Sequence, residues 1–93
     1  MEATGSQTAA ALSKLRNIGP KSARMLAAAG IDSIEALRTL GAAEVYRRVR
    51  LTNPDGVSRN MLWALQGALM DMDWRDLPDE IKAALQAEIE GGP

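Results

Sequence analysis

The stretch Met-Leu-Trp-Ala-Leu-Gln-Gly-Ala-Leu at residues 61–69 contains a single polar side chain, that of Gln66. A surface helix keeps one polar face, whereas a helix that is apolar nearly all round is buried among other elements. The chain has 93 residues, which suffices for one domain with one hydrophobic core. We therefore expect this helix at the centre of the domain, where the small residues Ala64, Gly67 and Ala68 let neighbouring helices approach closely.

The apolar composition favours helices over strands. The chain contains no Phe, two Trp and one Tyr, so Leu, Ile, Val, Met and Ala must build the core. Segments rich in Ala and Leu favour helix, and no segment alternates between apolar and polar residues with the period of a strand. These patterns predict an all-α fold, a small bundle of about five main helices.

Capping and turn residues define the expected boundaries of the helices. Gly19 with Pro20, Asp32 or Ser33, and Ser58 are suited to helix starts, and Gly30 and Gly41 to helix ends. The Thr-Asn-Pro-Asp-Gly sequence at 52–56 predicts a turn. The expected helical segments are 12–16, 20–29, 32–41, 42–51, 59–70 and one that starts at Pro78, with Ile81, Ala84, Leu85 and Ile89 facing inward. Residues 1–11 are expected to form a flexible arm, residues 12–90 the helical domain and residues 91–93 a tail.

The net charge of −1 conceals an asymmetry along the chain. Residues 10–62 carry nine Lys or Arg and four Asp or Glu, whereas residues 63–93 carry two and seven. The basic first half is compatible with a local basic surface. The alternatives are that the two halves attract each other or that both are simply solvated. No apolar run reaches the roughly 20 residues that span a membrane, no signal peptide is recognisable, and Cys is absent, so we expect a cytoplasmic protein.

The residue types exclude several kinds of chemistry. Without His and Cys, the chain cannot form a His-based nucleophile triad or a zinc site that uses those ligands. The acidic stretch that begins at Asp71 fails as a calcium loop, because Arg75 occupies a ligand position and Lys82 stands where a bidentate Glu is required. No glycine-rich phosphate-binding motif of nucleotide-dependent enzymes occurs. We therefore expect no enzymatic activity, no cofactor, no metal and no small-molecule substrate.

Residues 16–22, Arg-Asn-Ile-Gly-Pro-Lys-Ser, lead into a helix start that is suited to an anion. If Gly19 is the N-cap and Pro20 the first helical residue, the backbone N–H groups of Lys21 and Ser22 lack partners within the helix. Such groups lie at the positive end of the helix dipole and bind phosphates readily. The candidate nucleic-acid-binding residues are Lys14, Arg16, Asn17, Gly19, Lys21, Ser22 and Arg24.

Two parts of the sequence resemble known families. Residues 15–31 resemble the helix-hairpin-helix motif, with Asn17 where a Gly is usual; the resemblance implies that hairpin amides contact a DNA phosphate without reading bases. A longer resemblance, from Leu12 to Leu85, includes Asn-Met-Leu-Trp-Ala-Leu-Gln-Gly-Ala-Leu at 60–69 with Trp74 and Pro78 following. This longer region is similar to the C-terminal domain of TfoX/Sxy-type DNA transformation regulators. It implies an all-helical domain and a role in natural competence or related regulation.

Two functions stay open at this point. In the first, the domain is a regulatory module that contacts a protein partner or a second copy of itself, with Met70, Met72 and Trp74 as a candidate patch unless the tryptophans simply fill the core. In the second, the domain binds the DNA backbone weakly, independently of sequence, near the non-specific range of about 10⁻⁴–10⁻⁶ M. No exposed aromatic surface for stacking single strands is evident. A second basic group either extends the phosphate contact or forms a solvated helix side: Arg47, Arg48 and Arg50.

Overall fold

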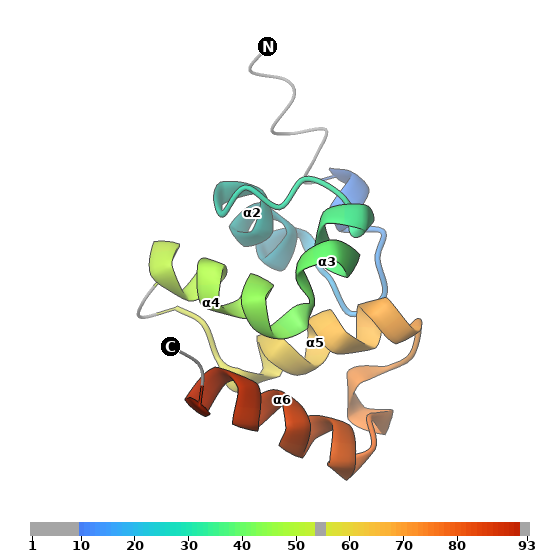
Figure 1. The fold of residues 1–93 in the computed structure, drawn as a ribbon. Helices are drawn as coiled ribbons and strands as arrows, with labels where there is room; N and C mark the ends of the chain where they lie inside the picture. Colours follow the sequence, from blue (N-terminus) through green and yellow to red (C-terminus); the bar gives the residue numbers. More distant parts are fainter. Residues whose placement is uncertain (1–9, 54–55, 92–93) are drawn as a thin grey trace.

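The computed structural model describes residues 10–53 and 56–91, and in this part of the chain the fold is all-α, as predicted (Figure 1). A helical turn at 10–12 precedes the main elements. These are α2 (Pro20–Ala28), α3 (Ile34–Leu40), α4 (Ala42–Thr52), α5 (Arg59–Met70), the 3-10 helix η1 (Trp74–Asp76) and α6 (Asp79–Gly91). Most of the expected arm (1–11), the centre of the expected turn (52–56) and the end of the tail (91–93) lie outside the described residues.

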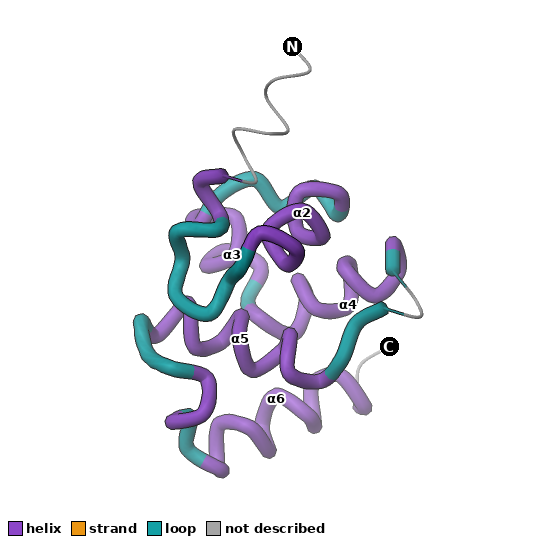
Figure 2. Tube along the Cα trace, turned by 180° about the vertical axis from the view of Figure 1, so that it is seen from behind, coloured by secondary structure: helices purple, strands orange, loops and turns teal. Residues whose placement is uncertain are grey.

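The core is centred on α5, with α4 as its main partner. Met61, Leu62, Trp63, Ala64, Leu65 and Gly67 of α5 are buried, which confirms the prediction from the apolar stretch. Helix α4 packs against α2, α3, α5 and α6, so it joins the two ends of the domain. Both views of the molecule show α4 and α5 between α2 and α3 on one side and α6 on the other (Figures 1 and 2). No helix in the described part of the chain is long and apolar enough to cross a membrane.

One glycine ends a helix and one serine starts a helix as their chemistry predicts. Gly30 has a φ of 85° and donates its N–H to the Ala27 carbonyl at 3.0 Å, while the Ile31 N–H reaches the Leu26 carbonyl at 3.0 Å. This pair of bonds is the Schellman ending of a helix. Ser33, rather than Asp32, caps α3 through a bond from the Ala36 N–H to its hydroxyl oxygen at 3.1 Å.

Several boundaries and faces differ from the sequence-based expectations. The first helical segment ends at Leu12 and a turn follows, because the Ser13 hydroxyl bonds the Ala10 carbonyl at 2.8 Å and competes with continuation of the helix. Pro78 precedes α6 instead of starting it, and its carbonyl accepts the N–H groups of Ile81 and Lys82, both at 3.1 Å. On α6 the expected inward position of Ala84 is wrong, since its side chain is exposed.

Candidate nucleic-acid interface

The hairpin loop, residues 13–19, connects the first helical turn to α2. Asn17 has a φ of 72°, in the left-handed region that Asn adopts more readily than most residues. Ile18 follows with a side chain that is only 3% exposed, so it anchors the loop in the core. The Ile18 N–H bonds the Leu15 carbonyl at 3.1 Å and closes the turn. As a result Gly19 and the start of α2 are held at the surface.

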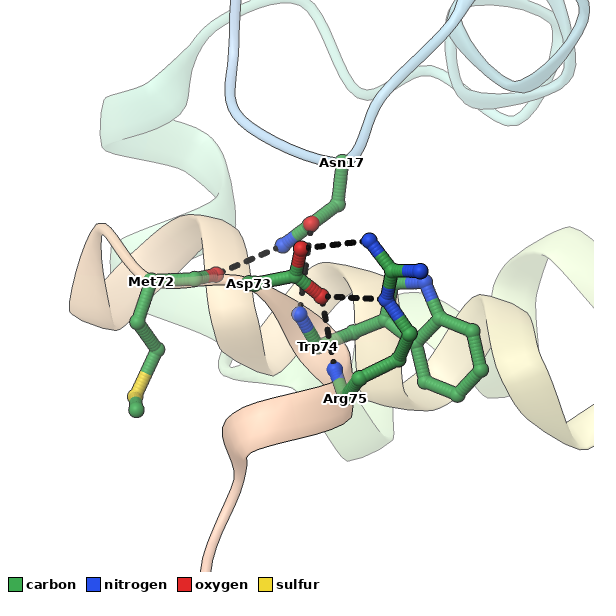
Figure 3. Close-up of polar contacts among 5 residues, drawn as sticks. All are labelled: Asn17, Met72, Asp73, Trp74 and Arg75. Carbon is green, nitrogen blue, oxygen red and sulfur yellow. Dashed lines mark hydrogen bonds and ion pairs between the residues drawn. The ribbon is translucent and has the colours of Figure 1, made fainter.

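The side chain of Asn17 ties the hairpin loop to the segment that follows α5 (Figure 3). Its Nδ2 donates to the Met72 carbonyl at 2.8 Å, and its Oδ1 accepts the Trp74 N–H at 3.3 Å. Gly67 makes this approach possible, because a Cβ there would collide with Asn17 Nδ2 and lie 2.7 Å from the Met72 oxygen. Asn17 therefore points into the protein, and its amide groups position the loop.

The N-terminus of α2 has the features of an anion site. Gly19 is its N-cap, no side chain caps it, Pro20 is at the first position, and the first turn contains no acidic residue. The Ala23 N–H bonds the Gly19 carbonyl at 2.9 Å, whereas the N–H groups of Lys21 and Ser22 have no acceptor among the described residues. Gly19, Pro20 and Lys21 are exposed and Ser22 is half-buried. This end of the helix is therefore open to a ligand that brings its own negative charge.

The four candidate cations, Lys14, Arg16, Lys21 and Arg24, are all exposed, and none forms an ion pair with another described residue. An acidic group does lie near one of them. Asp73 is held by Arg75, with Nη2 to Oδ2 at 2.9 Å and Nε to Oδ1 at 3.0 Å. These bonds to Arg75, with a smaller effect of the Arg16 charge, hold the pKa of Asp73 far below its usual range. The Asp73 carboxylate thus stays ionised, and Arg75 rather than Arg16 supplies most of its compensation.

A second helix N-terminus faces the hairpin across a cavity of about 300 Å³. Ser58 is the N-cap residue of α5, as predicted, but its side chain makes no capping hydrogen bond, and only its carbonyl accepts, from the Met61 N–H at 3.0 Å. The walls come from the hairpin loop, α2, the start of α5 and η1. The lining residues are Asn17, Lys21, Ser22, Met25, Gly56, Val57, Ser58, Asn60, Met61, Ala64 and Trp74.

The cavity gathers only part of the predicted site. Asn17, Lys21 and Ser22 line it, whereas Lys14, Arg16, Gly19 and Arg24 do not. The other eight lining residues were not among the predicted site residues, and those of them with a polar or aromatic side chain are Ser58, Asn60 and Trp74. A helix-starting Ser was visible at position 58, but nothing in the sequence indicates that this helix start lies opposite that of α2.

The arginines of α4 are engaged within the protein. Arg47 Nη1 lies 3.2 Å from Glu44 Oε1, Arg48 Nε lies 3.0 Å from Glu44 Oε2, and Arg47 also donates to the Glu88 carbonyl of α6. Bonds from Arg48 and then Arg47 lower the pKa of Glu44. The Arg50 guanidinium sits 5.5 Å from the centroid of the Tyr46 ring. These contacts favour the interpretation of this group as a helix side that supports the fold.

Comparisons with known proteins relate the chain to one family. The model of the family described as TfoX C-terminal domain matches residues 8–89. A DNA transformation protein, TfoX1 of Aliivibrio fischeri (strain ATCC 700601 / ES114), is 29% identical over 66 residues, which is 71% of this chain. The matched region spans about a third of that relative, 32% of its length. No solved structure matches the chain.

Proposed function

Because the chain belongs to the TfoX C-terminal domain family, we propose that it acts as a non-catalytic regulatory module in DNA transformation and that its hairpin contacts the DNA backbone. The proposed role in DNA transformation is supported by the name of the matched relative, a DNA transformation protein. One observation supports the DNA contact: the N-terminus of α2 is exposed and uncapped, with N–H groups of Lys21 and Ser22 that lack acceptors among the described residues.

The proposed contact is with phosphates and is independent of sequence. Backbone amides and exposed lysine or arginine side chains bind phosphate oxygens, which carry no base identity. Each neutralised phosphate adds about −0.9 to the slope of log affinity against log salt concentration. With about three such contacts, binding is weak and salt-sensitive, with a slope near −3. One copy of the domain therefore supplements other contacts rather than replacing them.

Reversal of one charge at the α2 N-terminus tests the proposal. The measurement is fluorescence anisotropy of a labelled DNA duplex at two salt concentrations, with wild type and Lys21→Glu. We expect Lys21→Glu to lower affinity at low salt by about tenfold and to reduce the salt slope by about one. A glutamate in the first turn of a helix stabilises it by about 0.3–1 kcal/mol, so thermal stability should not fall. Loss of binding then cannot be attributed to unfolding.

Arg38→Glu is the matched control. Arg38 is exposed on α3, outside the hairpin, and its reversal changes the net charge by the same amount. We expect it to reduce affinity far less than Lys21→Glu does. Equal losses in the two variants, or no binding of wild type to duplex at low salt, would refute the hairpin as the contact.

Contact with a protein partner, or with a second copy in a homodimer, stays a prediction and needs a different surface. The large apolar side chains exposed among the described residues are Leu51 at 82% and Met70 at 41%. They belong to the C-terminal ends of α4 and α5, which lie on opposite sides of the molecule (Figure 1). They therefore do not form one patch. Light scattering over a concentration series would detect a dimer.

A further inference from the structure

A cavity lies between α2 and the start of α5, beside the proposed phosphate contact. Its volume of about 300 Å³ reaches the lower end of the range for small-ligand pockets, about 300–1,000 Å³. Met61 and Ala64 are buried and form its floor, and Met25, Val57 and Trp74 are half-buried at its sides. The exposed lining residues, which form the rim, are Lys21, Gly56, Ser58 and Asn60. Asn17 and Ser22 add half-buried polar groups to the lining. A lining that combines apolar and polar groups fits a ligand that has an apolar part and a polar part.

The charge at the rim determines which kind of polar group the cavity can bind. Lys21 is the one charged residue that lines the cavity, and none of the lining residues is acidic. The N–H groups of Lys21 and Ser22, which have no acceptor among the described residues, belong to the same wall. A ligand that enters here meets positive charge and hydrogen-bond donors. The polar part is therefore an anion.

Trp74, which forms one wall of the cavity, determines which kind of apolar group of the ligand fits there. Trp74 is half-buried and lines the cavity, and its backbone N–H is held by Asn17 Oδ1 at 3.3 Å (Figure 3). This bond fixes the start of η1 against the hairpin loop, beside the anion site. Aromatic side chains in such positions stack bases of single-stranded nucleic acids, and the stacking tolerates any base. The hydroxyl of Ser58 and the amide of Asn60 at the rim can bond to base edges.

We propose that the cavity accepts one unpaired nucleobase of a single-stranded DNA, with the adjoining phosphate at the Lys21 and Ser22 amides. The inference rests on the proposed phosphate contact and adds the form of DNA that this contact prefers. A base in a duplex is paired and stacked, so it cannot enter the cavity without leaving the helix. The duplex then uses only the phosphate contact, and the single strand uses both the phosphate contact and the cavity.

Three DNA ligands of equal length separate the two proposals: a duplex, a single strand, and an abasic strand with the same phosphates. By anisotropy at low salt, we expect the single strand to bind about tenfold more tightly than the abasic strand, the effect of stacking one base. Equal binding of both strands would refute the cavity proposal and leave the phosphate contact intact. Failure of both the duplex and the abasic strand to bind would instead refute the proposed function.

A cavity-filling variant locates the effect. Ala64 lines the cavity from α5, outside the phosphate contact at the start of α2, and Leu is a good helix former, so Ala64→Leu fills the cavity without a helix penalty. We expect Ala64→Leu to bind the single strand and the abasic strand equally and to keep the affinity of wild type for the duplex. Thr39→Leu, at an exposed position of α3, is the control and should behave as wild type. A tenfold preference that survives in Ala64→Leu would overturn the assignment.

A readout on the wild-type protein keeps the test valid if Ala64→Leu does not fold. The single strand should quench the fluorescence of Trp74, and the abasic strand should not. A deoxynucleoside monophosphate should displace the labelled strand at high concentration, because it carries the same base and phosphate. If an acidic peptide displaced the strand equally well, the cavity would be a site for protein carboxylates, and the nucleobase assignment would be wrong.

Discussion

Lys21 on α2 and Arg48 on α4 are both exposed cations on short helices, but they have different surroundings. Arg48 lies 3.0 Å from Glu44, and its neighbour Arg47 bonds both Glu44 and the Glu88 carbonyl of α6. Lys21 has no ion-pair partner among the described residues, and the N–H groups beside it have no acceptor there. The two basic regions therefore differ in what remains available to a ligand, although their charges are alike.

The difference has a local cause that is visible in the sequence. Glu44 precedes Arg47 by three residues and Arg48 by four, the spacings at which side chains meet on a helix surface. Around Lys21 and Arg24 no acidic residue stands at those spacings. A cluster of arginines thus indicates a binding surface only when acidic partners at these spacings are missing. By this criterion the hairpin, rather than α4, is the candidate interface.

Among the substitutions that test this comparison, the largest loss of stability is expected where the support of the hairpin loop is removed, at Gly67. In Gly67→Ala the new Cβ collides with Asn17 Nδ2 and the Met72 carbonyl, which adds overpacking and breaks two hydrogen bonds. The better helix propensity of Ala offsets part of this cost, and we expect the free energy of unfolding to fall by about 2–4 kcal/mol. Urea denaturation followed by circular dichroism measures it.

Gly19→Ala is the matched control for that substitution. No heavy atom lies within 4 Å of the Cβ that Ala would add at position 19. Its cost is limited to the poorer N-cap, about 1 kcal/mol. Equal stability losses in Gly67→Ala and Gly19→Ala would show that the contact between Asn17 and α5 does not support the hairpin.

Loss of the Asn17 side chain should have the next largest effect. Asn17→Gly keeps the left-handed backbone and removes the bonds to Met72 and Trp74, so we expect a loss of about 2 kcal/mol. Asn17→Ala should cost about 1 kcal/mol more, because Ala disfavours a φ of 72°. Denaturation of both variants measures the difference. If Gly and Ala were equally tolerated, the left-handed turn would not be a constraint on residue 17.

The hydrogen bond from Asn17 to Met72 also illustrates which parts of the molecule can be predicted from its sequence. The start of α2, its Gly30 ending, the Ser33 cap and the burial of α5 depend on neighbouring residues, and the predictions for them are confirmed. The bond from Asn17 to Met72 joins residues 55 positions apart. No local pattern encodes that partner, so the sequence did not indicate that the Asn17 side chain would bond to the segment after α5. The cavity could not be predicted for the same reason, because its walls come from α2 and α5, which are far apart in the sequence.

The smallest effect on stability is expected from a substitution on α4, at Glu44. Bonds from Arg48 and Arg47 lower the pKa of Glu44 in the folded protein, so its ionised form is favoured by folding. Its contribution to stability is present above the ordinary glutamate pKa of about 4.3 and is lost as the pH falls through the lowered value. Glu44→Gln should therefore melt at a lower temperature than wild type at neutral pH, with the gap closing in acid and at high salt. Glu90→Gln, which removes an exposed carboxylate without an ion pair among the described residues, should show no such gap at any pH. A constant gap for Glu44→Gln from neutral to acidic pH would mean that the α4 arginines are not held by this carboxylate, and the contrast with the hairpin would disappear.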